Sequence, residues 1–487
     1  MAQYSDLENT YDLVIIGAGT GGCTTAIAAA QEGLNVCIID SKEKEDIGAK
    51  VCGDLMGKPI ISFINDHLGL DYSDIITNEL NGMDVYSPDG TVIPMPANGV
   101  MIDRYKFGQA LLNDALKAGC DLKDSCKCNG PVIEDSYVCG VELYDRIRNK
   151  ESVIHSKIVV DASGTSGGFR KNVCDIDSFD TSYLERDIEP KDMSCSYRQI
   201  VELKNPLDNA HKGKMILLPE VGGYYWVFPE SENKVNVGIG VACNHKKKIL
   251  KKRLENIKTE DKIFDSSKVI EGGGGSVPTR RSLYSLVANG FMLVGDAGSE
   301  VNPLTGGGLG PSIGAGYMCA KTAAKAIKNQ DVSQKGLWEY NIWYHDPSNK
   351  LRFEYKADLF DGGIVGRDVI REFVQSLSNA DVNWAFKNYI DDPTTFSKIV
   401  SADSSLLTFK RKAQTLINGV KNPILLKMGE ILSLMEEMNE IYENYPATPD
   451  LFSDWKKEVD SVDAKFNDMS TQSSWSMWLN LLSKTFC

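Results

Sequence analysis

The stretch YDLVIIGAGTGGCTTAIAAAQEGLNVCIID, residues 11–40, contains the features that decide the fold. Its apolar run at residues 13–16 is typical of a buried parallel strand. Three glycines follow in the spacing Gly-x-Gly-x-x-Gly, then an alanine-rich helical segment, and then a second strand that ends at Asp40. Strand, glycines, helix, strand and terminal acid in this order predict a dinucleotide-binding βαβ unit.

Each glycine of this motif has its own expected role. Gly17 makes the tight turn, Gly19 lets the backbone approach a pyrophosphate, and Gly22 allows the helix to pack closely on the strand. The helix N-terminus offers free N–H groups and the positive end of its dipole to the phosphates. Asp40 lies at about the distance along the chain from which an acidic side chain accepts hydrogen bonds from a ribose.

A second glycine-rich segment indicates which dinucleotide binds. Residues 290–327, GFMLVGDAGSEVNPLTGGGLGPSIGAGYMCAKTAAKAI, predict a strand ending at Gly295 and Asp296, a loop, and a helix that begins near Gly308. An aspartate at a strand end beside such a loop can bind the ribityl or phosphate-side groups of an extended FAD. The helix N-terminus would stabilise negative charge on the flavin ring.

Arg104 opens a predicted helix in MIDRYKFGQALLNDALKAG, residues 101–119. From there it could reach the FAD phosphates; a solvated charge on the helix surface is the alternative. Together with VVDASG at 159–164 and GDAG at 295–298, these features resemble the FAD fold of the p-hydroxybenzoate hydroxylase group. Only one dinucleotide fingerprint is visible, so we expect a separate electron donor to reduce the FAD.

The predicted fold class is α/β, with an FAD-binding Rossmann domain, an inserted α+β substrate domain and a C-terminal helical region. We expect the discontinuous FAD domain at 1–80, 100–178 and 270–330, the substrate domain at 81–99 and 179–269, and the helical region at 331–487.

Composition excludes several classes of protein. The net charge is −14, whereas a nucleic-acid-binding protein would be basic. The N-terminus lacks a basic signal-peptide region, and the uncharged residues 13–31 contain too many glycines for a membrane span, so we expect a cytoplasmic protein. The 12 cysteines are expected to be reduced thiols. The CKC pair at 126–128 has no second cluster nearby, so we expect no metal site.

An aromatic strand suggests what the second domain binds. In VGGYYWVFP, residues 221–229, Tyr224, Trp226 and Phe228 recur at every second position and should share one face of a strand. A plain hydrophobic core is the alternative to a wall that faces a substrate.

With GAKVCGD at 48–54 and KVNVGIGV at 234–241, this strand resembles the geranylgeranyl reductase family. That family's P-x-x-Y-x-W-x-F-P signature is matched here except that Val221 replaces the first proline.

The resemblance implies an FAD-dependent reductase that saturates isoprenoid C=C bonds, in particular those of archaeal digeranylgeranylglycerophospholipids. It implies a prenyl site lined by the three aromatic residues, and an electron donor that is a ferredoxin, a reduced deazaflavin or an NAD(P)H-linked protein. It also implies flavin contacts from Cys52, Gly53, Gly308 and Leu309, and an adenine contact from Cys128. Cys52 either donates a proton or serves as a packing or gating element.

Rival functions are an FAD monooxygenase or halogenase of the same fold, a reductase of a quinone side chain or of geranylgeranyl diphosphate, and a non-catalytic electron carrier. Two segments are candidates for contact with the cytoplasmic face of a membrane. One is the basic run at 246–253, where Ile249, Leu250, Leu254 and Ile257 are expected on one helical face. The other is the tail SSWSMWLNLLSKTF at 473–486. A solvated helix and a tail docked on the protein body are the alternatives.

Overall fold

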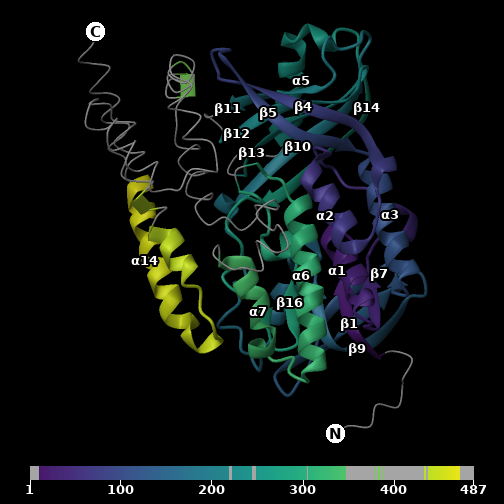
Figure 1. Ribbon diagram of the computed structural model, residues 1–487, viewed down its shortest axis with the longest axis vertical. Coiled ribbons are helices and arrows are strands. Elements are labelled where there is room, and N and C mark those ends of the chain that lie inside the picture. Colours follow the sequence, from purple (N-terminus) through teal and green to yellow (C-terminus); the bar gives the residue numbers. More distant parts are fainter. Residues whose placement is uncertain are drawn as a thin grey trace.

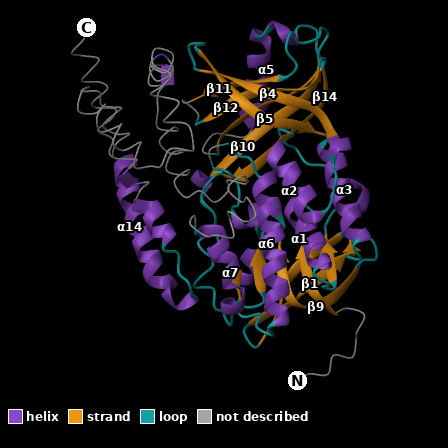
Figure 2. Cartoon of the chain, in the orientation of Figure 1, coloured by secondary structure: helices purple, strands orange, loops and turns teal. Residues whose placement is uncertain are grey.

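The computed structural model describes residues 10–218, 222–243, 248–303, 305–346, 379, 382–383, 387, 433–434 and 437–471. Two eight-stranded sheets lie at opposite ends of the molecule, with helices packed alongside and between them (Figures 1 and 2). The longer helices are α1 (Thr20–Gln31), α2 (Lys58–Leu68), α3 (Arg104–Lys117), α4 (Gly168–Cys174), α5 (Lys248–Glu260), α6 (Leu309–Lys328), α7 (Gln334–His345) and α14 (Phe452–Thr471).

The first sheet has the order β15-β16-β9-β1-β2-β6, with the β7–β8 hairpin attached to β9. Its central strand β1 pairs in parallel with β2 and with β9. The strands are β1 (Thr10–Ile16), β2 (Val36–Ile39), β6 (Asp121–Lys123), β7 (Cys126–Glu134), β8 (Tyr137–Asp145), β9 (Lys150–Asp161), β15 (Val287–Ala288) and β16 (Phe291–Leu293). Leu13, Val14 and Ile15 are fully buried, as expected for a parallel strand covered on both faces.

Two glycines of the fingerprint make the β1–α1 connection sterically feasible. Gly17 has a φ of +104°, in the left-handed region, and a Cβ on it would lie 2.4 Å from the carbonyl oxygen of Ala162. A Cβ on Gly22 would lie 1.9 Å from the carbonyl oxygen of Gly17. The tight turn and the close helix packing predicted for these residues are therefore confirmed.

The second sheet has the order β14-β10-β13-β12-β11-β4-β5-β3 and is antiparallel except between β11 and β4. Its strands are β3 (Leu55–Gly57), β4 (Ile76–Tyr86), β5 (Val92–Ile102), β10 (Met193–Glu202), β11 (Lys212–Leu218), β12 (Gly223–Ser231), β13 (Lys234–Ala242) and β14 (Lys268–Pro278). The ranges given for the two domains stay a prediction. The boundary at residue 80 divides β4 and leaves β3 with the FAD domain, whereas both strands belong to this second sheet.

Helix α5 covers the outer face of the second sheet (Figure 1). Leu250 and Leu254 are buried there, and Ile257 packs against the same core. The prediction that Ile249 shares this face is wrong, because its side chain is 54% exposed. At about 100° per residue, Leu250, Leu254 and Ile257 lie close together around the helix, and Ile249 lies at the margin of their face.

The prediction that the cysteines are reduced thiols is wrong for one pair. Cys195 on β10 and Cys243, just after β13, form a disulfide with their Cα atoms 5.1 Å apart. The two strands are antiparallel neighbours, and Cys195 lies opposite Val241. This register brings together two residues that are 48 positions apart, a proximity that spacing in the sequence does not reveal. The other described cysteines are free.

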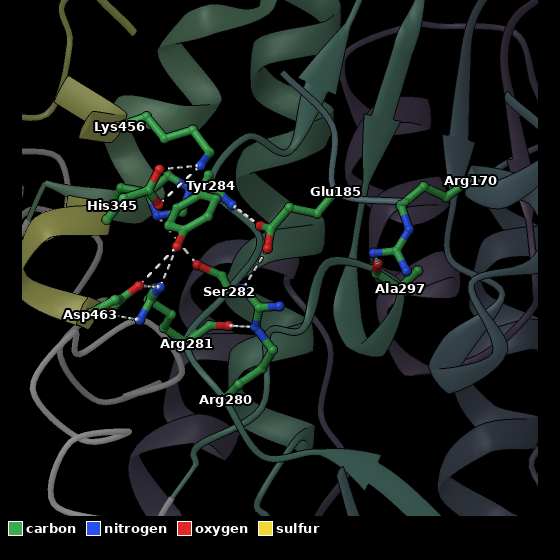
Figure 3. Close-up of polar contacts among 11 residues, drawn as sticks. Arg170, Glu185, Arg280, Arg281, Ser282, Tyr284, Ala297, His345, Lys456 and Asp463 are labelled. Atoms are coloured by element: carbon green, nitrogen blue, oxygen red, sulfur yellow. Dashed lines mark hydrogen bonds and ion pairs between the residues drawn. The ribbon is translucent and has the colours of Figure 1, made fainter. Parts of the chain in front are cut away.

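Partly buried polar contacts join helix α14 to the segment between β14 and β15 (Figure 3). Arg281 binds the carboxylate of Asp463 on α14 and the hydroxyl of Tyr284, and that hydroxyl also donates to Asp463 at 3.1 Å. Next to it, Glu185 accepts from the guanidinium of Arg280 and from the backbone N–H of Tyr284, both at 2.7 Å. Apolar side chains of α14 pack into the hydrophobic core that contains the first sheet.

None of the helices in the described ranges combines the length and the apolar character that crossing a membrane requires. The tail at 473–486 and the first two residues of the basic run at 246–253 lie outside the described residues.

Candidate functional site

A pocket lies beside the N-terminus of α1 and contains several of the predicted residues. Its lining includes Gly19, Thr20, Asp40, Lys50 and Arg104. Arg104 begins α3, as predicted, but it is buried and not a solvated surface charge. One guanidinium nitrogen, Nη2, donates to the hydroxyl of Thr20 at 2.8 Å. The other, Nη1, is buried and has no hydrogen-bond partner within the part of the chain that is described.

These groups fit an anionic ligand at the helix N-terminus. A buried guanidinium N–H without an acceptor destabilises the protein, so the pocket favours an acceptor beside Arg104. A Cβ on Gly19 would meet nothing closer than the Lys50 ammonium at 3.5 Å, so the space over this residue is open to a phosphate. Lys50 was missed by sequence reasoning, although it lies in the quoted GAKVCGD, because nothing in that loop shows that it folds back onto α1.

Asp40 lines this pocket, whereas Cys128 is not among its lining residues. The Asp40 carboxylate accepts from the backbone N–H of Ala18 and of Lys42, each at 2.8 Å, so it also shapes the glycine turn. Each carboxylate oxygen keeps a further lone pair, which a ribose hydroxyl can use. Cys128 lies on β7 and is half-buried; burial, and after it the charge of Asp161, raises the pKa of its thiol.

The second glycine-rich segment forms a turn next to the start of α6. Asp296 lies in the turn Gly295–Gly298, and its Oδ2 accepts from the hydroxyl of Thr165 at 3.0 Å. Its Oδ1 would lie 3.5 Å from a Cβ on Gly308, the residue that precedes Leu309 at the start of α6. The turn and the free N–H groups of α6 are thus brought together as predicted. Arg170 supports the turn by donating to the Ala297 carbonyl at 3.0 Å (Figure 3).

A buried acid behind this turn was not anticipated from the sequence. Glu300 accepts from the Tyr340 hydroxyl at 2.8 Å and from the backbone N–H of Gly295. Burial raises the pKa of Glu300 to about 8. The Glu300 carboxyl therefore holds the backbone of the Asp296 turn in place.

The three predicted aromatic residues share one face of β12. The ring centroids of Tyr224 and Trp226 are 5.8 Å apart, and those of Trp226 and Phe228 are 6.1 Å apart. Trp226 and Phe228 are buried against Leu80 of β4 and Met101 of β5, two other strands of the same sheet. The prediction of one aromatic face is confirmed; we call these three residues the aromatic wall.

The aromatic wall contacts two loops, one at Gly53 and one before α6. A Cβ on Gly53 would lie 3.6 Å from the Phe228 ring and 4.0 Å from the Trp226 indole nitrogen. The Tyr224 hydroxyl donates to the Thr305 carbonyl, in the loop before α6, at 2.5 Å. The wall therefore spans the distance between the Cys52–Gly53 loop and the loop that leads to Gly308.

The glycine run at 271–276 has a steric role beside this loop. It lies on the edge strand β14. A Cβ on Gly273 would lie only 2.5 Å from the side chain of Val51, which immediately precedes Cys52. The run therefore leaves room for the Cys52 loop to lie against β14.

Three potential metal ligands lie close together on neighbouring strands of the first sheet. Side-chain ligand atoms of Glu134, Cys139 and His155, on β7, β8 and β9, lie within 4.8 Å of one another. Among the described residues, no comparable group of ligands lines the pocket beside α1.

Comparisons with known proteins agree with this geometry. Residues 192–277 match the family model of the geranylgeranyl reductase catalytic domain, and residues 12–167 match that of FAD dependent oxidoreductases. The chain is 33% identical to the digeranylgeranylglycerophospholipid reductase of Sulfolobus acidocaldarius, covering 94% of this chain and 99% of that protein. The protein of the same name from Methanosarcina acetivorans is 32% identical, covering 68% of this chain and 80% of its own length.

Solved structures share the fold. A geranylgeranyl bacteriochlorophyll reductase-like protein from Thermoplasma acidophilum has a TM-score of 0.70 at 24% identity, covering 87% of this chain and 99% of its own. A myxobacterial chondrochloren halogenase, which is FAD-dependent, has a TM-score of 0.60 at 17% identity, covering 79% of this chain and 90% of its own. The predicted p-hydroxybenzoate hydroxylase-like FAD fold is confirmed. From its sequence match along almost the whole of a curated relative, the chain belongs to the geranylgeranyl reductase family of FAD-dependent oxidoreductases.

Proposed function

We propose that this protein is an FAD-dependent reductase that saturates the C=C bonds of geranylgeranyl chains in digeranylgeranylglycerophospholipids. The observation that carries the proposal is the aromatic wall, which lies between the Cys52–Gly53 loop and the loop before α6. The names of the curated relatives support the same substrate class.

The aromatic wall suits both the substrate and the chemistry. A geranylgeranyl chain is long and apolar, and its binding site should present few polar groups. Bound FAD in its reduced form supplies a hydride to the alkene, and a proton must also reach the other carbon. Because the alkene is not activated, positive charge develops on carbon, and the faces of Tyr224, Trp226 and Phe228 can stabilise it.

We infer the following roles for the residues that hold the cofactor. Gly19, Arg104 and Lys50 bind the pyrophosphate, supported by the open space over Gly19 and the unpaired buried nitrogen of Arg104. Asp40 binds the adenosine ribose and Cys128 contacts the adenine. At the other end, Asp296 binds the ribityl or phosphate-side groups, and the flavin ring is contacted by the backbone at Cys52, Gly53, Gly308 and Leu309.

The halogenase-like structures do not favour a second function, because below 25% identity they share the fold alone. Other prenyl compounds are distinguished by experiment. Reduced enzyme incubated separately with a digeranylgeranyl phospholipid, geranylgeranyl diphosphate and a prenylquinone should add one pair of hydrogens per saturated bond to the phospholipid, measured by mass spectrometry. Saturation of only the diphosphate or the quinone would contradict the proposed substrate.

We also infer that an external donor reduces the FAD, because the sequence contains one dinucleotide fingerprint. A ferredoxin, a reduced deazaflavin and an NAD(P)H-linked protein are the candidates. Anaerobic bleaching of the flavin absorbance by each donor compares them directly. Rapid bleaching by NAD(P)H alone would contradict the inference.

Contact with a membrane surface is a further proposal, supported by exposed residues of α5. Ile249 is 54% exposed, and the neighbouring Lys251 and Lys252 are exposed as well. Each such cation contributes about 1 kcal/mol near an anionic surface. Co-sedimentation with anionic vesicles should therefore fall in the double variant Lys251→Glu/Lys252→Glu, and a matched double variant on α14, Lys456→Glu/Lys457→Glu, should bind as the wild type does. Equal loss in both pairs would show only an effect of net charge.

Gly19→Val and Gly22→Val should have different consequences. The valine at 19 fills the space proposed for the pyrophosphate and clashes with nothing rigid, so this variant should fold but bind no FAD. The valine at 22 would collide with the Gly17 carbonyl, so this variant should be strongly destabilised. Thermal unfolding and flavin absorbance after reconstitution measure the two effects. FAD bound to a folded Gly19→Val protein would contradict the placement of the pyrophosphate.

Trp226→Ala should impair alkene reduction far more than reduction of the bound flavin by dithionite. The substitution removes the central ring of the aromatic wall, and deleting a buried Trp also costs about 3–5 kcal/mol of stability. Stopped-flow measurement of the two half-reactions separates these effects, with Trp226→Phe as the control that keeps an aromatic face. Equal loss in both half-reactions would mean that the strand is only core.

Cys52→Ser tests whether the thiol delivers the proton. Burial and the charge of Asp54 raise the pKa of Cys52, so the thiol keeps its proton at neutral pH. General acid steps contribute about 10²–10⁴-fold, and serine is a much weaker acid, so single-turnover alkene reduction should slow by that order while FAD stays bound. If Ser and Ala variants instead both lose only a few-fold, Cys52 is a packing or gating element.

A further inference from the structure

We propose that Glu134, Cys139 and His155 bind a zinc ion that joins the β7–β8 hairpin to β9. The inference goes beyond the proposed function and does not depend on it, because none of these three described residues lines the pocket beside α1. The CKC pair at 126–128 is not part of the site.

The three side chains come from neighbouring strands and converge. Glu134 ends β7, Cys139 lies near the start of β8, and His155 lies on β9. A carboxylate oxygen, the thiol sulfur and an imidazole nitrogen lie within 4.8 Å of one another. With bonds of about 2.3 Å to sulfur and about 2.0–2.1 Å to nitrogen or oxygen, the ligand atoms of a tetrahedral zinc ion are about 3.5 Å apart. Movement of roughly 1 Å closes the site, and the exposed Glu134 can supply it.

A β-bulge explains how the thiol and the imidazole reach the same place. Val132 pairs with Gly140 and Ile133 pairs with Val138, so Cys139 is the extra residue of β8. His155 lies opposite Gly140, the next residue along β8. In a regular ladder, the side chains of residues 139 and 155 would point to opposite faces of the sheet. A bulge changes the direction of a side chain, and it does so here at the residue whose sulfur approaches His155.

The backbone that carries these ligands is held in place on both sides. The N–H of Val138 donates to the Asn289 carbonyl at 3.0 Å, and the Asn289 side-chain amide donates to the Ser136 carbonyl at 3.1 Å. The tip of the hairpin is thereby fixed to the turn between β15 and β16. His155 lies in a strand that pairs with both β1 and β8. Ligands on rigid strands are positioned more precisely than ligands on loops.

The chemistry of the three groups selects the metal. Thiolate, imidazole and carboxylate are the ligands of zinc, whereas Mg²⁺ and Ca²⁺ take oxygen ligands. Burial and the charge of Glu134 raise the pKa of Cys139 to about 11, so the metal-free thiol keeps its proton. When zinc binds, the sulfur forms a bond to the ion and the proton passes to solvent. Three protein ligands leave one tetrahedral position for a water molecule.

The first test measures zinc bound to untagged, FAD-loaded protein after dialysis against metal-free buffer. The wild type should retain a single zinc ion per chain. Cobalt in its place should give the visible absorbance of a tetrahedral ion, at longer wavelengths than oxidised flavin absorbs. His155→Ala should weaken zinc binding by more than about 100-fold, the upper end of the cost of losing a partner that only supports a ligand.

Glu134→Gln probes the site without disturbing the core, because this side chain is exposed. It should also weaken zinc binding, and the zinc chelator that lowers the unfolding temperature of the wild type should leave that of this variant unchanged. Glu142→Gln removes another exposed acid, from β8, and is the matched control. It should bind zinc and respond to the chelator as the wild type does.

A second measurement shows whether the sulfur is a ligand. Zinc should slow alkylation of Cys139 by iodoacetamide by about tenfold or more, followed by peptide mass spectrometry, and the chelator should restore the rate. Cys174 is also a half-buried free thiol but lies outside the cluster, so zinc should not change its alkylation.

The outcomes decide the proposal without any assay of alkene reduction. Zinc retained in the wild type, lost in Glu134→Gln and protecting Cys139 supports the site, even if the protein reduces no prenyl lipid. Zinc that dialyses away from the wild type, or that binds equally to Glu134→Gln and leaves Cys139 reactive, overturns it. If His155→Ala does not fold, the comparison of Glu134→Gln with Glu142→Gln decides.

Discussion

The contact between Gly22 and the carbonyl of Gly17 is the constraint on which the architecture depends, because α1 can follow β1 only if no side chain lies between them. Close backbone approach at a glycine also joins helices α1 and α6. A Cβ on Gly316 of α6 would lie 2.7 Å from the Gly21 carbonyl of α1. Backbone contact between α1 and α6 therefore sets the distance between their N-termini, where we propose that the cofactor binds.

Hydrogen bonds connect two loops near the aromatic wall to residues of the second sheet. The Cys52–Gly53 loop comes from the segment after β2, but its carbonyl is held by Arg198 and Asn236 of the second sheet. In return, Tyr224 of the second sheet bonds to the loop before α6. Because residues of the second sheet hold both the Cys52–Gly53 loop and the loop before α6, these two loops are fixed relative to the aromatic wall.

Local patterns predicted much of this from the sequence, since their meaning depends on near neighbours in the chain. The fingerprint around Gly17, the helix that begins after Gly308 and the alternating rings of β12 are of this kind. Contacts made by distant segments could not be predicted. The hydrogen bond between Asn236 and Asp54 joins residues 182 positions apart. The Cys195–Cys243 disulfide depends on strand register. The steric role of the glycine run in β14 is visible only once Val51 is known to pack against it.

Helix α14 has a consequence for how the chain folds during synthesis. Its buried Phe452, Trp455 and Val459 belong to the core that contains the first sheet. The ring centroids of Trp455 and Tyr445 are 4.8 Å apart. A ribosome makes these residues after all the strands of the first sheet. Until α14 has been made, the apolar surface that it covers is exposed on the nascent chain, where chaperones can bind it.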